Sequence, residues 1–305
     1  LIVAHHPIIF SGLKKINGKN YIERTIIKAI KNDISIYACH TNLDNVRFGV
    51  SNVIADKLSL KNRHILEPKK SILKKLFTYI PTDKKDDLLN VLFAAGAGNI
   101  GNYSECSFSV NGNGTFKGND FSNPVVGEKG IRSNENESKI EVIFPNYLEA
   151  KIIQTLKQNH PYEEVAYEVI SLDNTFQEVG SGMIGELDEE MDESAFLSFL
   201  KKNMQTQCIR YTNLLNKKVK KVAVCGGAGS FLLKQAIWQK ADVFITADFK
   251  YHQFFDADNQ IVICDIGHYE SEQFTSHLFN KIISEKFPNF AVQISTINTN
   301  PINYK

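Results

Sequence analysis

Three short polar clusters in the sequence carry residue types that bind metal ions. They are His5 with His6, His40 with Asp44, and His268 with Glu272. His268 and Glu272 are spaced i, i+4 at the expected start of a helix, so both side chains lie on one face and can converge on one ion. Imidazoles and carboxylates without thiolates suit zinc, iron, nickel or, less well, manganese. The clusters therefore indicate a metal site without cysteine ligands.

The number of candidate ligands bears on how many ions such a site would hold. Five or six ligands are too many for a single tetrahedral zinc. Adjacent histidines in an extended chain point to opposite sides, so His5 and His6 would serve two ions, or one ion after a bend at Pro7. A two-metal site with a bridging carboxylate accounts for the surplus. The alternative is that these are ordinary polar residues at strand ends, because sequence does not show that the three clusters are neighbours.

Each cluster follows an apolar segment that reads as a strand. These segments are residues 1–4, 34–39 and 261–264. Helical spacing of apolar residues in 21–31 and in about 50–58 gives a β-α-β-α order, which is typical of a parallel sheet covered by helices. Ligands of such sheets bind at the carboxyl ends of the strands. We therefore expect three strand ends of one sheet to form the site.

The middle of the chain has a different pattern. Strands are predicted at 76–80, 106–110, 140–144 and 165–172, helices at 83–95 and 147–158, and a solvated loop at 129–139. This is the β-α-β-β-α-β order of a split βαβ domain. Strands at 219–225, 241–246 and 261–264 and helices at 231–239 and about 268–285 then return to an α/β pattern. The expected organisation is an α/β core formed by 1–72 and 178–305 and interrupted by an α+β domain at 73–177.

Composition limits the class of protein and its partners. The 305 residues are 43% hydrophobic and 23% charged, which excludes a disordered or fibrous chain. A net charge of +1 gives no basic field to support a nucleic-acid partner. Five widely spaced cysteines without a CxxC favour a reducing, cytoplasmic location, and no apolar run reaches the roughly 18–20 residues that span a bilayer. The chain opens at Leu1 inside an apolar run, so we expect a further segment upstream.

Four motifs resemble those of the Nif-three-like family, also labelled GTP cyclohydrolase I type 2 homologues. They are Ala4-His5-His6-Pro7 with Phe10 and Gly12, residues 40–44 (HTNLD), residues 246–252 (TADFKYH) and residues 267–272 (GHYESE). The middle domain is similar to the PII/CutA-like insertion of longer bacterial members, on residues 95–103 and on residues 160–164 (HPYEE). The resemblance covers essentially the whole chain.

The resemblance implies specific roles for these residues. It implies that two divalent metal ions, of zinc, iron or manganese, are held by His5, His6, Asp44, His268 and Glu272. Glu272 would bridge the ions, and His40 beside them would be the catalytic general acid or base. The resemblance also implies a toroidal homohexamer whose sites face an interior cavity. Asp248 and His252 are candidates to orient ligands or to contact the substrate, with an exposed polar helix start as the alternative.

The expected chemistry is hydrolysis of a nucleotide. A two-metal centre lowers the pKa of bound water to about 7 and so supplies hydroxide at neutral pH. In the reaction that the family label implies, hydroxide attacks C8 of the guanine of GTP, formate leaves, and dihydroneopterin triphosphate forms. A metal-dependent phosphoesterase and a non-catalytic metal or nucleotide sensor, with the PII-like insert as its regulatory module, stay open. The turn at 226–230 (GGAGS) fits phosphate binding and tight packing equally well.

Overall fold

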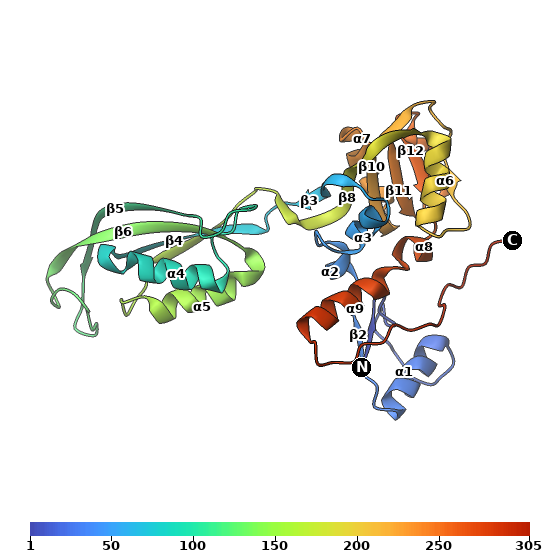
Figure 1. Ribbon diagram of the computed structural model, residues 1–305. Coiled ribbons are helices and arrows are strands. Elements are labelled where there is room, and N and C mark those ends of the chain that lie inside the picture. The colour runs from blue at the N-terminus through green and yellow to red at the C-terminus, as the bar shows by residue number, and fades with distance from the viewer. The chain divides into compact units, whose positions relative to one another are not determined.

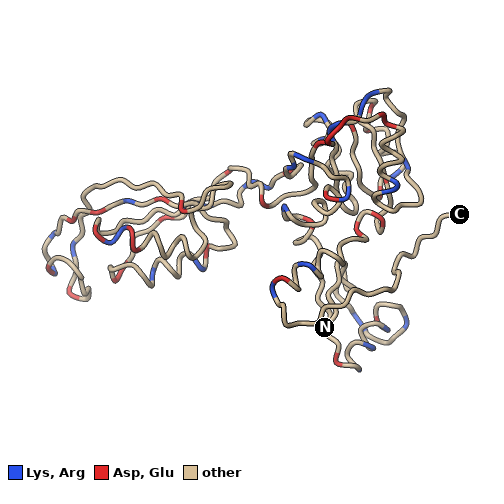
Figure 2. The backbone as a smooth tube through the Cα atoms, in the orientation of Figure 1, with Lys and Arg blue, Asp and Glu red and all other residues tan.

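The computed structural model describes residues 1–305, which form two compact units (Figure 1). One unit comprises Leu1–Pro68 and Gln177–Lys305, and the other comprises Lys69–Phe176. Acidic and basic residues lie along both units rather than being segregated between them (Figure 2). None of the helices combines the length and apolar character that crossing a bilayer requires.

The first unit is built around a six-stranded sheet. In spatial order its strands are β3 (Lys61–Lys69), β8 (Phe176–Asp192), β10 (Lys218–Ala228), β11 (Val243–Ala247), β12 (Val262–Asp265) and β9 (Arg210–Tyr211). Strands β10, β11 and β12 run parallel, while β8 and β9 pair antiparallel with β10 and β12. Every residue of β11 is buried, as expected for a central strand covered on both faces. The sequence did not predict β3, β8 or β9.

A second, two-stranded sheet lies in the same unit. Its strands β1 (Ile2–Ala4) and β2 (Ile36–Ala38) are parallel and are joined through α1 (Tyr21–Lys31). The side chain of Asn20 caps α1 by accepting a hydrogen bond from the Glu23 amide at 2.9 Å. The expectation that all three metal-binding clusters end strands of one sheet is wrong. The first two clusters follow β1 and β2, whereas the third follows β12 of the six-stranded sheet.

The first unit contains further helices, some of which cover both faces of the large sheet. They are α2 (Thr41–Asp44), α3 (Val50–Lys57), α6 (Glu193–Asn203), α7 (Leu233–Trp238), α8 (His268–Glu272) and α9 (Thr275–Lys286), with 3-10 helices η3 (Ser230–Leu232) and η4 (Tyr251–Ala257). One core cluster includes Ile54, Phe196 and Ile245, and another includes Phe244 and Phe249. The single helix predicted at 268–285 is instead two helices, α8 and α9. They are separated at Phe274, which is only 8% exposed and packs into the core.

The second unit has the predicted β-α-β-β-α-β order. Its elements are β4 (Leu73–Pro81), η1 (Thr82–Lys84), α4 (Lys85–Ala95), β5 (Ser107–Lys117), β6 (Arg132–Pro145), η2 (Asn146–Leu148), α5 (Glu149–Asn159) and β7 (Tyr167–Ser171). The sheet order is β5-β6-β4-β7, with all neighbours antiparallel. Leu76 and Phe144 of the sheet share a buried core with Leu92 and Leu156 of the two helices. This confirms an α/β core with an inserted α+β unit.

The solvated loop predicted at 129–139 is wrong for most of its length. Strand β6 begins at Arg132 and pairs residue by residue with β5 from Lys117↔Arg132 to Ser107↔Val142. Most side chains in the first half of β6 are exposed or only half-buried, because this part of the hairpin extends beyond the helices. A strand that buries neither face has no reason to alternate apolar and polar residues, so its sequence resembles a loop.

Candidate metal centre

The structure brings together all six side chains of the three clusters. They are His5 and His6 after β1, His40 and Asp44 at the two ends of α2, and His268 and Glu272 on α8. The Glu272 Oε2 atom lies 3.2 Å from Nε2 of both His6 and His268, and 3.7 Å from Nε2 of His5. The His5 Nε2 atom is also 3.3 Å from Asp44 Oδ1. Segments from both ends of the chain therefore meet at one carboxylate.

The candidate ligand atoms form three overlapping trios, each within 4.8 Å. The trios are His5-His6-His40, His6-His268-Glu272 and His5-Asp44-Glu272. Glu272 is shared by the two trios that contain a carboxylate. This is the position expected for a carboxylate that would bridge two ions. The His40 ring lies 5.3 and 5.0 Å, centroid to centroid, from the rings of His5 and His6. His40 thus belongs to the cluster, but it lies beside the imidazoles of His5 and His6 and belongs to neither trio that contains Glu272.

Several of these ligand atoms are buried without a hydrogen-bond partner. They are His5 Nε2, Asp44 Oδ1 and Glu272 Oε2. A buried polar atom that makes no hydrogen bond destabilises a fold, so native proteins satisfy nearly all such atoms. Divalent cations would satisfy all three atoms, and a set of imidazoles and carboxylates matches zinc, iron or manganese. The residues present therefore fit the metal centre that the sequence suggested.

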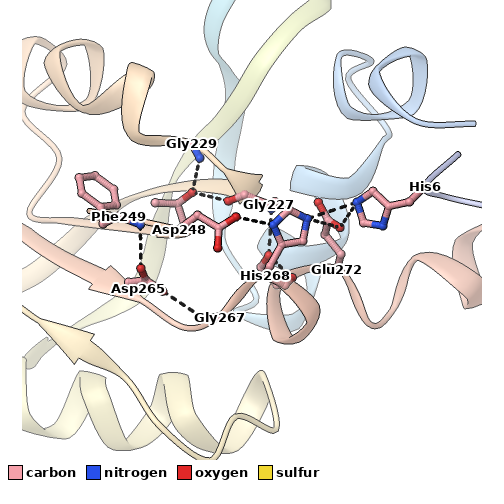
Figure 3. Close-up of polar contacts among 12 residues, drawn as sticks. His6, Gly227, Gly229, Asp248, Phe249, Asp265, Gly267, His268 and Glu272 are labelled. Carbon is pink, nitrogen blue, oxygen red and sulfur yellow. Dashed lines mark hydrogen bonds and ion pairs between the residues drawn. The ribbon is translucent and has the colours of Figure 1, made fainter. Parts of the chain in front are cut away.

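Contacts behind the cluster orient two of the imidazoles. The Nδ1 atom of His5 is 2.9 Å from the Cys39 carbonyl oxygen. The Nδ1 atom of His268 is 2.6 Å from Asp248 Oδ2, as Figure 3 shows. In metal sites the ring nitrogen that does not face the ion usually makes this kind of bond, which fixes the tautomer and the ring orientation. Both Nε2 atoms are thereby left to face Glu272.

His252, the other residue suggested for an orienting or substrate-binding role, makes no hydrogen bond or ion pair with the cluster. Its ring packs against Tyr251, with 5.1 Å between centroids. Asp248 has a φ of +58° and precedes η4, so Asp248 and His252 do not share a helical face as their spacing had suggested. Of the pair, only Asp248 contacts a candidate ligand.

The electrostatics of the cluster favour positive charge beside Glu272. Burial opposes protonation of His5, but the nearby carboxylates of Asp44 and Glu272 outweigh it and raise the pKa of His5 to about 10. The ion-pair contact with Glu272 is the largest cause that raises the pKa of His268 to about 9. Burial alone would raise the pKa of Glu272, yet the nearby imidazoles of His268, His5 and His6 hold it well below the usual range. Bound cations would take the place of these protons.

The glycine turn after β10 packs against the cluster. The Gly227 amide donates to Ser271 Oγ and the Gly229 amide donates to Thr246 Oγ1, both at 2.9 Å. A Cβ atom on Gly227, whose φ is +63°, would overlap Glu272 Oε1. These amides are already bonded within the fold rather than open to a phosphate. The structure thus favours tight packing, with Gly227 making room for Glu272.

Sequence reasoning missed one residue beside the cluster. Asp265 is the last residue of β12, is 3% exposed, and accepts hydrogen bonds from the amides of Phe249 and Gly267. These two residues adjoin Asp248 and His268. The available signal was a carboxylate that ends an apolar strand directly before the third cluster, because a charge at such a position is rarely buried unless it is paired.

Known proteins match nearly the whole chain. The model of the family described as Duf34/NIF3 (NGG1p interacting factor 3) matches residues 1–301. A Bacillus subtilis (strain 168) protein named GTP cyclohydrolase 1 type 2 homolog is 37% identical, covering 100% of this chain and 83% of the relative. A Staphylococcus aureus (strain MSSA476) protein of the same name is 34% identical, covering 99% and 83%.

Solved structures agree with this assignment. The crystal structure of a Bacillus cereus protein related to NIF3 superposes with a TM-score of 0.85 at 38% identity, covering 100% of this chain and 83% of that one. Staphylococcus aureus protein SA1388 gives a TM-score of 0.75 at 30% identity, with 100% and 82% covered. Similarity of this extent in both sequence and fold shows that the chain belongs to the Duf34/NIF3 family.

Proposed function

We propose that this protein is a metal-dependent hydrolase that acts on a nucleotide. The observation that carries the proposal is the position of Glu272 Oε2, which lies within 3.7 Å of the Nε2 atoms of three histidines. GTP is the first candidate substrate, because relatives that match the whole chain are named GTP cyclohydrolase 1 type 2 homolog.

Two trios of side chains would hold the ions. In this proposal His5 and Asp44 bind one ion, His6 and His268 bind the other, and Glu272 is shared between them. Divalent zinc, iron or manganese bound there would supply Lewis acidity and lower the pKa of water to about 7. The chain itself supplies the negative charge of Asp44 and Glu272, and it fixes the imidazoles of His5 and His268 from behind.

His40 is proposed as the group that moves a proton. Burial lowers its pKa, and the neighbouring His6 and His5 act in the same direction against the opposing charge of Asp44. His40 is therefore a neutral imidazole at neutral pH and is able to accept a proton from a reacting group. Its ring also meets the exposed ring of Phe10 edge-on, with centroids 5.9 Å apart, so it borders the surface from which a substrate would approach.

A product assay tests the proposal. The full chain, loaded in turn with zinc, manganese or iron, is incubated with GTP and with nucleotides that lack guanine, and the products are separated by chromatography. Formation of a pterin triphosphate that depends on metal and is lost in Glu272→Gln supports cyclohydrolase activity. Equal turnover of nucleotides without guanine would instead favour a phosphoesterase, and no turnover by metal-loaded protein would overturn the hydrolase proposal.

Two further variants separate the roles of the residues. His40→Ala should abolish turnover while leaving metal content near normal; loss of metal would make His40 a ligand instead. Asp44→Ala should lower the metal content of folded protein. Full metal stoichiometry in both Asp44→Ala and Glu272→Ala would show that the ligand set is wrong.

A cavity in the second unit favours the sensor as the second candidate function. Its volume is about 540 Å³, a size common among small-molecule sites. Phe116, Val125 and Tyr162 are among its apolar lining residues. At its polar side the Tyr162 hydroxyl donates to Glu137 Oε1 at 2.8 Å. Residues of the predicted PII/CutA-like motif at 160–164 therefore line a cavity that the metal chemistry does not use.

Charge around this cavity suggests the kind of ligand to try. Glu137, Glu163 and Glu164 line it, and of its lysines Lys139 already pairs with Glu141 at 3.4 Å. Amines such as spermidine should therefore protect residues 111–126 and 160–166 from hydrogen exchange better than ATP or GTP does. Protection without turnover would support a sensor; no protection by any of these compounds would remove its structural basis.

A homohexameric assembly is proposed on the family resemblance, and a cytoplasmic location on the cysteine usage. A homohexamer predicts a solution mass close to six chains by light scattering, and a monomeric mass would contradict it. All five cysteines are free, in keeping with a reducing cytoplasm.

A further inference from the structure

Asp265 lies behind the metal centre and joins two loops of the first unit. Its Oδ2 atom accepts the Phe249 amide at 2.9 Å and its Oδ1 atom accepts the Gly267 amide at 3.1 Å. Phe249 directly follows Asp248, and Gly267 directly precedes His268. One buried carboxylate thus fixes the backbone next to both members of the Asp248-His268 pair (Figure 3).

Arg210 on β9 completes this arrangement. Its guanidinium forms an ion pair with Asp265 Oδ2, and Nη2 also donates to the Phe249 carbonyl oxygen at 3.1 Å. Both polar groups of the Phe249 backbone are therefore held, one by the carboxylate and one by the guanidinium. The Phe249 side chain is 2% exposed and is anchored in the core. The residue after Asp248 is consequently fixed at its backbone and at its side chain.

The conformation of the two loops shows why such fixing is needed. Asp248 has a φ of +58°, in the left-handed region that residues with a Cβ atom rarely occupy, and Gly267 has a φ of +90°. Strained backbone of this kind persists only where the surroundings determine it strongly, and it is concentrated at functional sites. Here the strained residue, Asp248, carries the carboxylate that bonds His268 Nδ1 at 2.6 Å.

We propose that Asp265, together with Arg210, is the positioning residue of the metal centre. It holds Asp248 against His268 Nδ1 and so aims His268 Nε2 at Glu272, without touching an ion itself. This inference rests on the proposed metal site. The positioning role requires a carboxylate at residue 265, because only a carboxylate accepts hydrogen bonds from two amides and a guanidinium at once. An asparagine has one acceptor oxygen and would turn an N–H donor toward a donor.

The test compares metal binding in Asp265→Asn, Asp248→Asn and the double variant. Affinity for Zn²⁺ is measured by competition with a chromophoric chelator, and ions per chain are counted by mass spectrometry. In each single variant the ion assigned to His6 and His268 should bind about 10–100-fold less tightly, the usual effect of losing a group that orients a ligand. Because Asp265 acts through Asp248, the double variant should be no worse than the worse single variant.

A matched control separates positioning from plain loss of stability. Glu193, 7% exposed in the same unit, accepts the amides of Leu215 and Asn216 at 2.9 and 3.0 Å. Glu193→Gln thus removes a buried carboxylate with two backbone bonds away from the cluster. It should lower the melting temperature but leave Zn²⁺ affinity unchanged. If Asp265→Asn does not fold, Arg210→Gln replaces it in the test, because the Arg210 side chain is half-exposed. Arg210→Gln should lower the Zn²⁺ affinity by a smaller factor. In a protein that already carries Asp248→Asn, it should lower the affinity no further.

The possible results test the positioning role of Asp265 separately from the existence of the metal centre. Failure of the wild-type protein to bind any divalent ion would overturn the proposed metal centre and the positioning role together. Wild-type binding with unchanged affinity in Asp265→Asn, or losses that add up in the double variant, would overturn the positioning role alone.

Discussion

Replacing Gly227 by alanine should disturb the proposed metal centre although Gly227 is not itself a candidate ligand. The φ of +63° at this position costs an L-residue about 1–2 kcal/mol. The new methyl group would also overlap Glu272 Oε1 and come within 3.3 Å of His268 Cε1. Glu272 must then move away from the histidines that it contacts. A displaced ligand of this kind should weaken metal binding about 10–100-fold, or roughly 1.4–2.7 kcal/mol.

The assay measures both quantities on the same protein. Zn²⁺ affinity is obtained by chelator competition, and the melting temperature of the metal-free protein is obtained by calorimetry. Gly101→Ala is the matched control, because Gly101 has a φ of +58° and nothing within 4 Å of the added Cβ. Gly227→Ala should lose at least as much stability in its unit as Gly101→Ala loses in the second unit, but only Gly227→Ala should lose metal affinity. Wild-type affinity in a folded Gly227→Ala protein would refute the reasoning that Glu272 depends on this glycine.

Three further predictions concern metal, pH and the core of the second unit. Removing metal with a chelator should lower the melting temperature of the first unit, since free ion at 100 times its Kd stabilises by about 2.7 kcal/mol; Glu272→Gln should show a much smaller shift, and equal shifts in both proteins would contradict the site. His160 is 8% exposed, bonds the Tyr79 carbonyl oxygen through Nε2 and accepts the Tyr162 amide at Nδ1, and burial lowers its pKa from 6.5. The contribution of His160 to stability is therefore complete above pH 6.5 and is lost as pH falls below that value. The free energy of unfolding of the second unit, measured by denaturant, should fall between pH 7.5 and 5 and should fall less in His160→Gln; identical pH dependence in the two proteins would refute this. Leu76→Ala, at a fully buried position, should cost about 2–5 kcal/mol in denaturant unfolding of the second unit and leave Zn²⁺ uptake unchanged, whereas reduced uptake would show that the two units are coupled.

Elements with a strong local signal were predictable from sequence. Helix α1 spans Tyr21–Lys31 as expected, because isoleucines recur along one face and Asn20 provides the N-cap. The extended start of β6 was not predictable, since its exposed side chains leave no alternation to detect. Neither was the division into two sheets, because apolar runs predict strands but not which strands pair.

The candidate site too was predictable from the sequence only in part. Its histidines and carboxylates were identified because they follow predicted strands, and the structure brings them together even though the strands belong to two sheets. The part played by Asp265 was not foreseen, because it depends on backbone amides of Phe249 and Gly267, and every residue type except proline offers an amide N–H. Gly227 likewise has no motif of its own, since what matters there is the absence of a side chain beside Glu272.

The wide separation of the ligands along the chain has a consequence for biosynthesis. His6 and His268 are 262 residues apart, and the whole second unit is synthesised between them. At about 5–20 residues per second, roughly 13–52 s pass on the ribosome between the two histidines. During that interval His5, His6, His40 and Asp44 lack their carboxylate partner on α8, while the second unit is already complete enough to fold. In the proposed metal centre, loading is then expected only after α8 has been made, so nascent chains arrested before α8 should retain no tightly bound ion.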